Sequence, residues 1–124
     1  MSGFRSARGA VAVEFALVLP LLLAILFAII EFGHAYNVQI SVTHAAREAA
    51  RSMAVTQVWS DAVDAAQDSS PSLDPAVLTL AHSPATCAPG TPVEVTAQYP
   101  LTGLTGLMPA GITVTGRAAM QCGG

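Results

Sequence analysis

The feature that most constrains this chain is an uncharged apolar run over residues 15–30, FALVLPLLLAILFAII, which contains a single proline, Pro20. The apolar character extends over residues 10–33. As a helix, residues 10–33 would rise about 36 Å, which is enough to cross a hydrocarbon core of roughly 30 Å. We therefore predict one membrane-spanning helix here, with Pro20 as the expected position of a kink.

The charges beside the apolar run predict its orientation. Arg5 and Arg8 precede the run without an acidic neighbour, and the next basic residue, Arg47, lies well past its other end. Because basic residues favour the cytoplasmic side, we expect a single-pass protein of the cell membrane with a cytoplasmic N-terminus and an extracytoplasmic C-terminus. The chain has no lysine, five scattered arginines and a net charge of −3, which argues against nucleic acid as a partner.

Composition divides the chain into four predicted segments: a basic leader over 1–9, the membrane helix over 10–33, an extracytoplasmic helix extension over 34–67 and a small β-rich head over 68–124. The extension reads as helix because apolar residues recur there at three- and four-residue spacing, and residues 34–70 contain no glycine or proline. The residues of this stripe are Val38, Val42, Ala45, Ala49 and Met53. We predict one continuous or slightly kinked helix from Ala10 to Gln67.

Two segments of the head, 92–99 and 112–117, alternate apolar and polar residues as half-buried strands do. Residues 76–82 are a third candidate strand, although Asp74 and Pro75 could equally cap a short helix there. A sheet of about three strands is marginal alone, so we expect one face to pack on the apolar stripe of the long helix. The predicted fold class is α+β, a long helix that carries a small antiparallel sheet.

The two cysteines, Cys87 and Cys122, both fall on the predicted extracytoplasmic side. That side is oxidising in most cells, so we predict a disulfide, the alternative being two free or separately buried thiols. The single tryptophan, Trp59, is expected to pack against the sheet rather than to stack on a ligand.

Glu14 places a carboxylate inside the first turns of the predicted membrane helix. Such a charge costs up to about 2.5 to 3.5 kcal/mol at the bilayer centre unless a cation neutralises it. If the chain were cut after Gly9, the new α-amino group of Ala10 could pair with Glu14 of a neighbouring subunit. The plain alternative is a carboxylate in the headgroup zone, favoured by the helix dipole.

A glycine, four small or apolar residues and Glu-Phe occur here as Gly9, AVAV and Glu14-Phe15. This pattern resembles the cleavage site of the Tad/Flp branch of type IV pilins. The residues that follow, VEFALVLPLLLAILFAIIEFGHAYN and the AAREAAR element at 45–51, are similar to the TadE-like family. The resemblance covers roughly the first half of the chain, and the second half is similar only loosely.

The resemblance implies a minor pilin or pseudopilin with a pilin-like fold, which a prepilin peptidase processes after Gly9. Gly9 and Ala10 would form the processing site, and Glu14 and Phe15 would serve assembly with other pilin or pseudopilin subunits of a Tad-type surface pilus or related secretion apparatus. Loss of the leader, with Arg5 and Arg8, would take the net charge from −3 to −5. The mature chain could then leave the membrane for an extracellular pilus.

Four charged residues farther along the helix are candidate contacts for a partner: Glu31, Arg47, Glu48 and Arg51. The plain account of Glu31 is an interfacial carboxylate near His34. The plain account of the other three is a solvated helix face, on which Glu48 could pair with Arg51 or His44.

Other classes of protein fit the sequence less well. Glu14 and Glu31 are about 26 Å apart along a helix, too far to act as an acid–base pair within one chain. The histidines and the two cysteines form no recognised catalytic or metal-binding motif. We therefore expect no catalytic residue, no metal site and no cofactor. A secreted protein cleaved near Ala35 and a permanently anchored surface binding module remain alternatives. Where the chain is cut, or whether it is cut, separates these classes.

Overall fold

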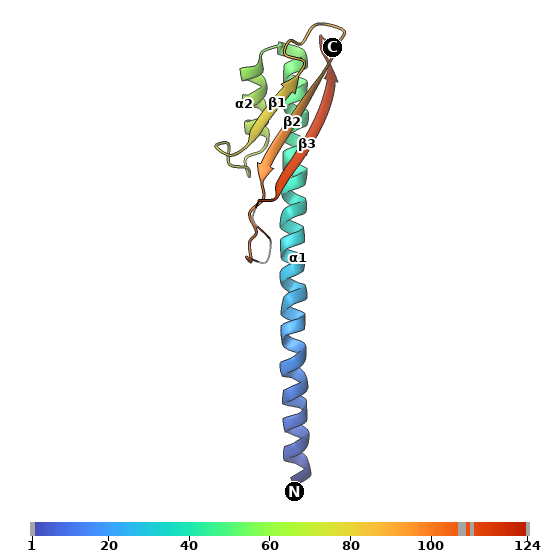
Figure 1. Cartoon of the computed structure of the whole chain (residues 1–124), viewed down its shortest axis with the longest axis vertical. Coiled ribbons are helices and arrows are strands. Elements are labelled where there is room, and N and C mark those ends of the chain that lie inside the picture. Colours follow the sequence, from blue (N-terminus) through green and yellow to red (C-terminus); the bar gives the residue numbers. More distant parts are fainter. Residues whose placement is uncertain (1, 107–108, 110, 124) are drawn as a thin grey trace.

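The structure is a computed structural model that describes residues 2–106, 109 and 111–123. It contains two helices, α1 (Ser2–Thr56) and α2 (Trp59–Ser69), and three strands, β1 (Thr79–Ser83), β2 (Pro92–Pro100) and β3 (Thr113–Gln121). Figure 1 shows α1 as one long rod, with α2 and the sheet gathered around its C-terminal part. The N-terminal part of α1 projects away from this head. The predicted α+β class, a long helix with a small sheet, is confirmed.

The sheet has the order β1-β2-β3, and both pairings are antiparallel. Along β2 the side chains alternate as predicted, with Val93, Val95 and Ala97 buried and Glu94 and Gln98 exposed. Both predicted strands are confirmed. The third candidate forms a strand as well, β1, which begins at Thr79 and pairs Leu80 with Ala97.

The core lies between the inner face of the sheet and the apolar stripe of α1, where small side chains allow a close approach. Ala45 and Ala49 of α1 are fully buried, and they belong to the same core cluster as Val93 and Val95 of β2. β3 approaches α1 closely at Gly116, where an added Cβ would lie 2.8 Å from the Cα and N atoms of Thr43. The sheet and helix therefore pack backbone against backbone at this point.

The long helix ends earlier than predicted. α1 ends at Thr56 and α2 begins at Trp59, so the predicted continuous helix to Gln67 is wrong at its outer end. Gln57 takes a left-handed conformation with φ of 58°, and its N–H still donates to the Met53 carbonyl at 2.9 Å, which is a recognised way to end a helix. The end of α2 returns to α1, since the Ser70 hydroxyl donates to the carbonyl of Ser41 at 3.3 Å.

Two predicted contacts of the head are confirmed. A disulfide joins Cys87 to Cys122, which directly follows β3. The Trp59 ring packs on the sheet through His82 of β1, with ring centroids 4.2 Å apart. The C-terminal end is also tied to the long helix, because the N–H of Gly123 donates to the carbonyl of Ala54 at 2.9 Å.

Candidate functional site

The predicted processing and assembly positions lie on the free part of α1. The helix runs through Gly9 without interruption, and an added Cβ there would meet no atom within 4 Å. Ala10 and Glu14 are exposed, as is Phe15, with 63% of its surface accessible. Ala10 and Glu14 are four residues apart and therefore share one face of the helix. Their proposed roles involve a second protein and stay predictions.

The apolar part of α1 is not covered by the other residues that the structure describes. Its large apolar side chains between residues 17 and 30 are each 40–72% exposed in the isolated chain. By length and composition, α1 is the helix of the described residues that could cross a membrane. Burial of that much apolar surface is strongly favourable, so this part of α1 needs either lipid or other helices around it.

An apolar stripe continues along α1 beyond the predicted membrane segment. Phe32, Tyr36 and Ile40 follow one another at four-residue spacing and are 73%, 70% and 51% exposed. Side chains at this spacing share one face of a helix. Neither the sheet nor α2 covers this stripe, which we call the outer stripe.

The charged candidates farther along α1 lie within the head. Arg47 and Arg51 are exposed and Glu48 is half-buried. Among the side chains that the structure describes, Glu48 forms no hydrogen bond with Arg51 or His44, the pairing that the sequence suggested. Exposure fits both the solvated helix face and a contact for a partner, so the partner contact stays a prediction.

Glu31, expected from the sequence to be an interfacial carboxylate, is buried by another part of the chain. Only 5% of its surface is exposed, and its Oε1 atom accepts hydrogen bonds from the backbone N–H and the hydroxyl of Thr105. Thr105 lies in the loop between β2 and β3. In the described part of the chain, the second carboxylate oxygen, Oε2, is buried without a hydrogen-bond partner.

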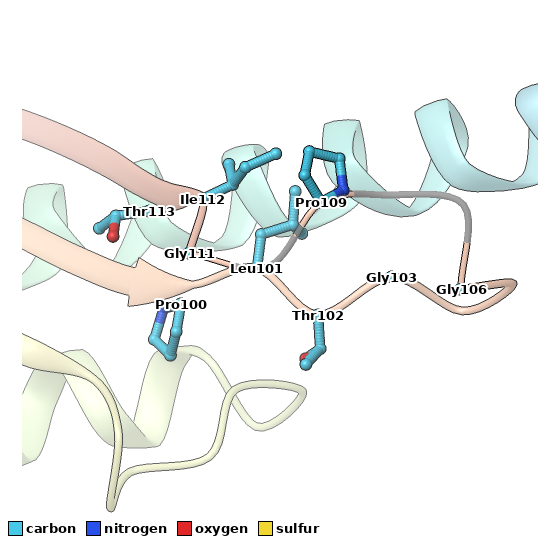
Figure 2. Close-up of a pocket in the computed structure, with 9 residues that line it drawn as sticks. All are labelled: Pro100, Leu101, Thr102, Gly103, Gly106, Pro109, Gly111, Ile112 and Thr113. Carbon is cyan, nitrogen blue, oxygen red and sulfur yellow. The ribbon is translucent and has the colours of Figure 1, made fainter.

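His34 forms a second link between α1 and the same loop. Its Nε2 atom lies 3.1 Å from the carbonyl oxygen of Thr102. Together with the Glu31–Thr105 contact, this link holds the loop against the helix at the foot of the head, and we call the two contacts the loop clamp. Figure 2 shows the loop, where Leu101 and Ile112 point to one side and Thr102 points to the other.

The sequence alone did not reveal the loop clamp. Glu31 and Thr105 are 74 residues apart, and a threonine in a glycine-rich loop carries no specific signal. The one available hint was the cost of a carboxylate at the end of an apolar run, which predicts some partner for Glu31 without naming it.

We expect Glu31→Ala to loosen the loop without unfolding the head. A hydrogen bond to a charged group contributes about 1.5 to 3 kcal/mol, and each 1.4 kcal/mol is tenfold in an opening equilibrium, so amide exchange at Thr105 should accelerate by about tenfold or more. Hydrogen exchange of the full chain in detergent micelles measures this. Glu48→Ala, a half-buried glutamate on the same helix away from the loop, serves as the matched control. Equal protection of Thr105 in both variants would show that Glu31 does not hold the loop.

The remaining polar groups do not assemble into a site with obvious chemistry. In the part of the chain that the structure describes, no three His, Cys, Asp or Glu side chains lie close enough together to hold a metal ion. A hollow of about 220 Å³ opens between α1, the segment before β1 and the β2–β3 loop, and Asn37, Tyr99 and His34 contribute to its lining. Part of this lining belongs to the loop clamp.

Comparison with known proteins supports the reading of the N-terminal half. Residues 9–51 match the family model described as TadE-like protein, so the resemblance to the TadE-like family is confirmed on this segment. The match supports a protein associated with a Tad-type pilus, and the single apolar helix suggests a single-pass membrane protein. No curated protein and no solved structure matches the chain.

Proposed function

Since residues 9–51 are TadE-like, we propose that the chain is a minor pilin or pseudopilin that is processed after Gly9 and used in assembling a Tad/Flp-type surface pilus or related secretion apparatus. One observation carries the proposal furthest. The apolar part of α1 is exposed along residues 17–30, while a small folded head sits at the other end of the same helix. We infer a structural role without catalysis.

Exposed apolar helices explain how such a subunit could move from membrane to fibre. In the bilayer, lipid tails cover the side chains between residues 17 and 30. In a fibre, the helices of neighbouring subunits would cover the same side chains with comparable packing contacts. The outer stripe of Phe32, Tyr36 and Ile40 supports this proposal, because it would extend the contact between helices past the bilayer.

The position of Glu14 suggests how neighbouring subunits would come into register. After cleavage, the α-amino group of Ala10 would be the first cation of the chain, one helical turn before Glu14. A neighbour displaced along the helix axis by about 6 Å would bring its Glu14 level with this amine. A charge-assisted hydrogen bond between them would neutralise both groups in apolar surroundings.

The first test is the N-terminus and intact mass of the protein recovered from cells. A chain that starts at Ala10 supports pilin-type processing. A start at Tyr36 moves the protein to the secreted class, and an uncleaved chain favours a permanent membrane anchor. Either of the last two results would overturn the proposed processing.

The second test concerns Glu14. We expect Glu14→Ala to be cleaved normally at Gly9 but to be lost from the sheared surface fraction, because the amine of Ala10 would lack its partner. Immunoblots of sheared and cell-bound fractions measure this loss. Glu48→Ala removes a glutamate from the head portion of the same helix and should behave as wild type. If Glu14→Ala still reaches the surface fraction, the pairing is wrong even where cleavage occurs.

A further inference from the structure

The loop between β2 and β3, residues 101–112, has an unusual composition for an exposed loop. It contains no charged residue, and its polar side chains are the two threonines, Thr102 and Thr105. Leu104 is 64% exposed although it lies between the two threonines that form the loop clamp. A single exposed leucine is ordinary, so its meaning depends on where the loop places it.

The loop descends along α1 toward the apolar segment. The contact of Thr102 is with His34, and the contact of Thr105 is with Glu31, three residues closer to the N-terminus of the helix. Three helical residues correspond to about 4.5 Å along the axis. In Figure 1 the same loop extends from the end of β2 beside α1, on the side of the head that faces the free helix. Leu104, between these two threonines, therefore lies beside the part of α1 that contains Glu31 and His34.

This level coincides with the outer boundary expected for the bilayer. Glu31 directly follows the apolar run, which ends at Ile30. A hydrocarbon core of roughly 30 Å flanked by headgroup layers of about 5 to 7 Å puts Glu31 at the edge of the hydrocarbon and the loop in the headgroup layer. Phe32, which directly follows Glu31 and is 73% exposed, lies at the same level.

The loop is held in this position rather than hanging freely. Leu101 is buried in the core, and its N–H donates to the carbonyl of Ile112 at 2.8 Å, which closes the base of the loop. Thr105 supplies two hydrogen-bond donors to Glu31, so the loop also screens a carboxylate that would otherwise face lipid. An exposed leucine fixed at this depth has lipid as its natural surroundings.

We propose that residues 101–106 of the β2–β3 loop form a membrane-contact element that inserts Leu104 into the outer leaflet while the chain resides in the bilayer. The loop clamp sets its depth, and the head is thereby seated on the membrane surface. The occupant of this surface is lipid, continuous with the lipid around residues 10–33. The proposal rests on the membrane-spanning helix alone and does not require cleavage or pilus assembly.

A tryptophan placed at Leu104 tests the proposal directly. The full chain carrying Trp59→Phe and Leu104→Trp is reconstituted at one copy per nanodisc, in phosphatidylcholine with or without bromine near the headgroup end of the acyl chains. We expect a blue-shifted emission that loses about half of its intensity in the brominated discs. If Trp59→Phe fails to fold, the same quenching is measured with Trp59 retained, as a difference from the otherwise unchanged chain.

Val55→Trp in the same background is the matched control. Val55 is 68% exposed and lies at the far end of α1, about 36 Å from Glu31 along the axis, so its emission should resemble that in water and resist bromine. Equal behaviour of the two tryptophans would overturn the proposal. A blue shift at position 104 without quenching would also overturn it, because the loop would then be covered by protein rather than by lipid.

Discussion

We expect replacement of Gly116 by alanine to destabilise the head more than any other single methyl group added to the sheet. The new Cβ would lie 2.8 Å from the Cα and N atoms of Thr43 and 2.9 Å from the carbonyl carbon of Val42. These are backbone atoms of α1, so no side chain can rotate away to make room. Overpacking of this kind costs about 1 to 3 kcal/mol, and we place Gly116→Ala at the upper end.

Thermal unfolding of the full chain in detergent micelles, followed by circular dichroism of the sheet, measures this loss. For a folded unit of this size, about 2 to 3 kcal/mol corresponds to a fall in Tm of roughly 10 °C or more. Ala119→Val is the control, since it enlarges an exposed side chain on the same strand and should change stability by less than about 0.5 kcal/mol. Equal Tm values for Gly116→Ala and wild type would mean that β3 does not approach α1 this closely.

The strands were predictable because their signal is local. The alternation of Val93, Val95 and Ala97 with polar neighbours is a two-residue period that only a half-buried strand satisfies, and β2 lies where the pattern placed it. The ambiguity at residues 76–82 also had a local cause, because Asp74 and Pro75 are compatible with a helix start. Its resolution as a strand from Thr79 depends on pairing with β2, which is not local.

The end of α1 was missed because it carries no glycine or proline. The chain instead uses Gln57 in a left-handed conformation, which few residues other than glycine adopt. Thr56 contributes through its hydroxyl, which donates to the Ser52 carbonyl at 2.9 Å and accepts from the N–H of Val58 at 3.2 Å. Such bonds between a side chain and the backbone compete with the hydrogen bonds of a continuing helix. The helix ends at this point, and the interruption lets α2 fold back onto α1.

The candidate site divides in the same way. The processing and assembly positions could be predicted from the sequence, because the motif that identifies them is a local run of residues. They are Gly9, Ala10, Glu14 and Phe15. The partner of Glu31 was not, since Thr105 becomes its neighbour only through the complete fold of α1 and the sheet. The close approach at Gly116 lies between these cases, because a glycine inside an alternating strand is a known sign of nearby backbone.

The second large effect is expected from the disulfide, which closes a loop over 35 residues of sequence separation that includes all of β2 and β3. Cross-linking a loop of this length removes chain entropy from the unfolded state that corresponds to about 3 to 4 kcal/mol. Both cysteines are buried, Cys87 at 7% and Cys122 at 2% exposure. After reduction, the two thiols would therefore gain little from contact with water while the head stays folded. The head has few large core side chains with which to offset such a loss.

We therefore expect the double variant Cys87→Ala, Cys122→Ala to lose about 3 to 4 kcal/mol of stability, visible as a lower midpoint in urea unfolding of the full chain in micelles. Reduction of the wild type should lower its midpoint to a similar extent and raise its intact mass by two hydrogens, while reduction should leave the double variant unchanged. We expect β3 to open first, because it is an edge strand and Cys122 directly follows it. The N–H of Cys122 donates to the carbonyl of Thr91 at 2.8 Å, and this bond would weaken without the disulfide. Fraying from this end would separate Gly116 from α1, so faster amide exchange along β3 than along β1 is the expected signature. A wild type whose mass and midpoint are insensitive to reduction would show that the two thiols are not joined.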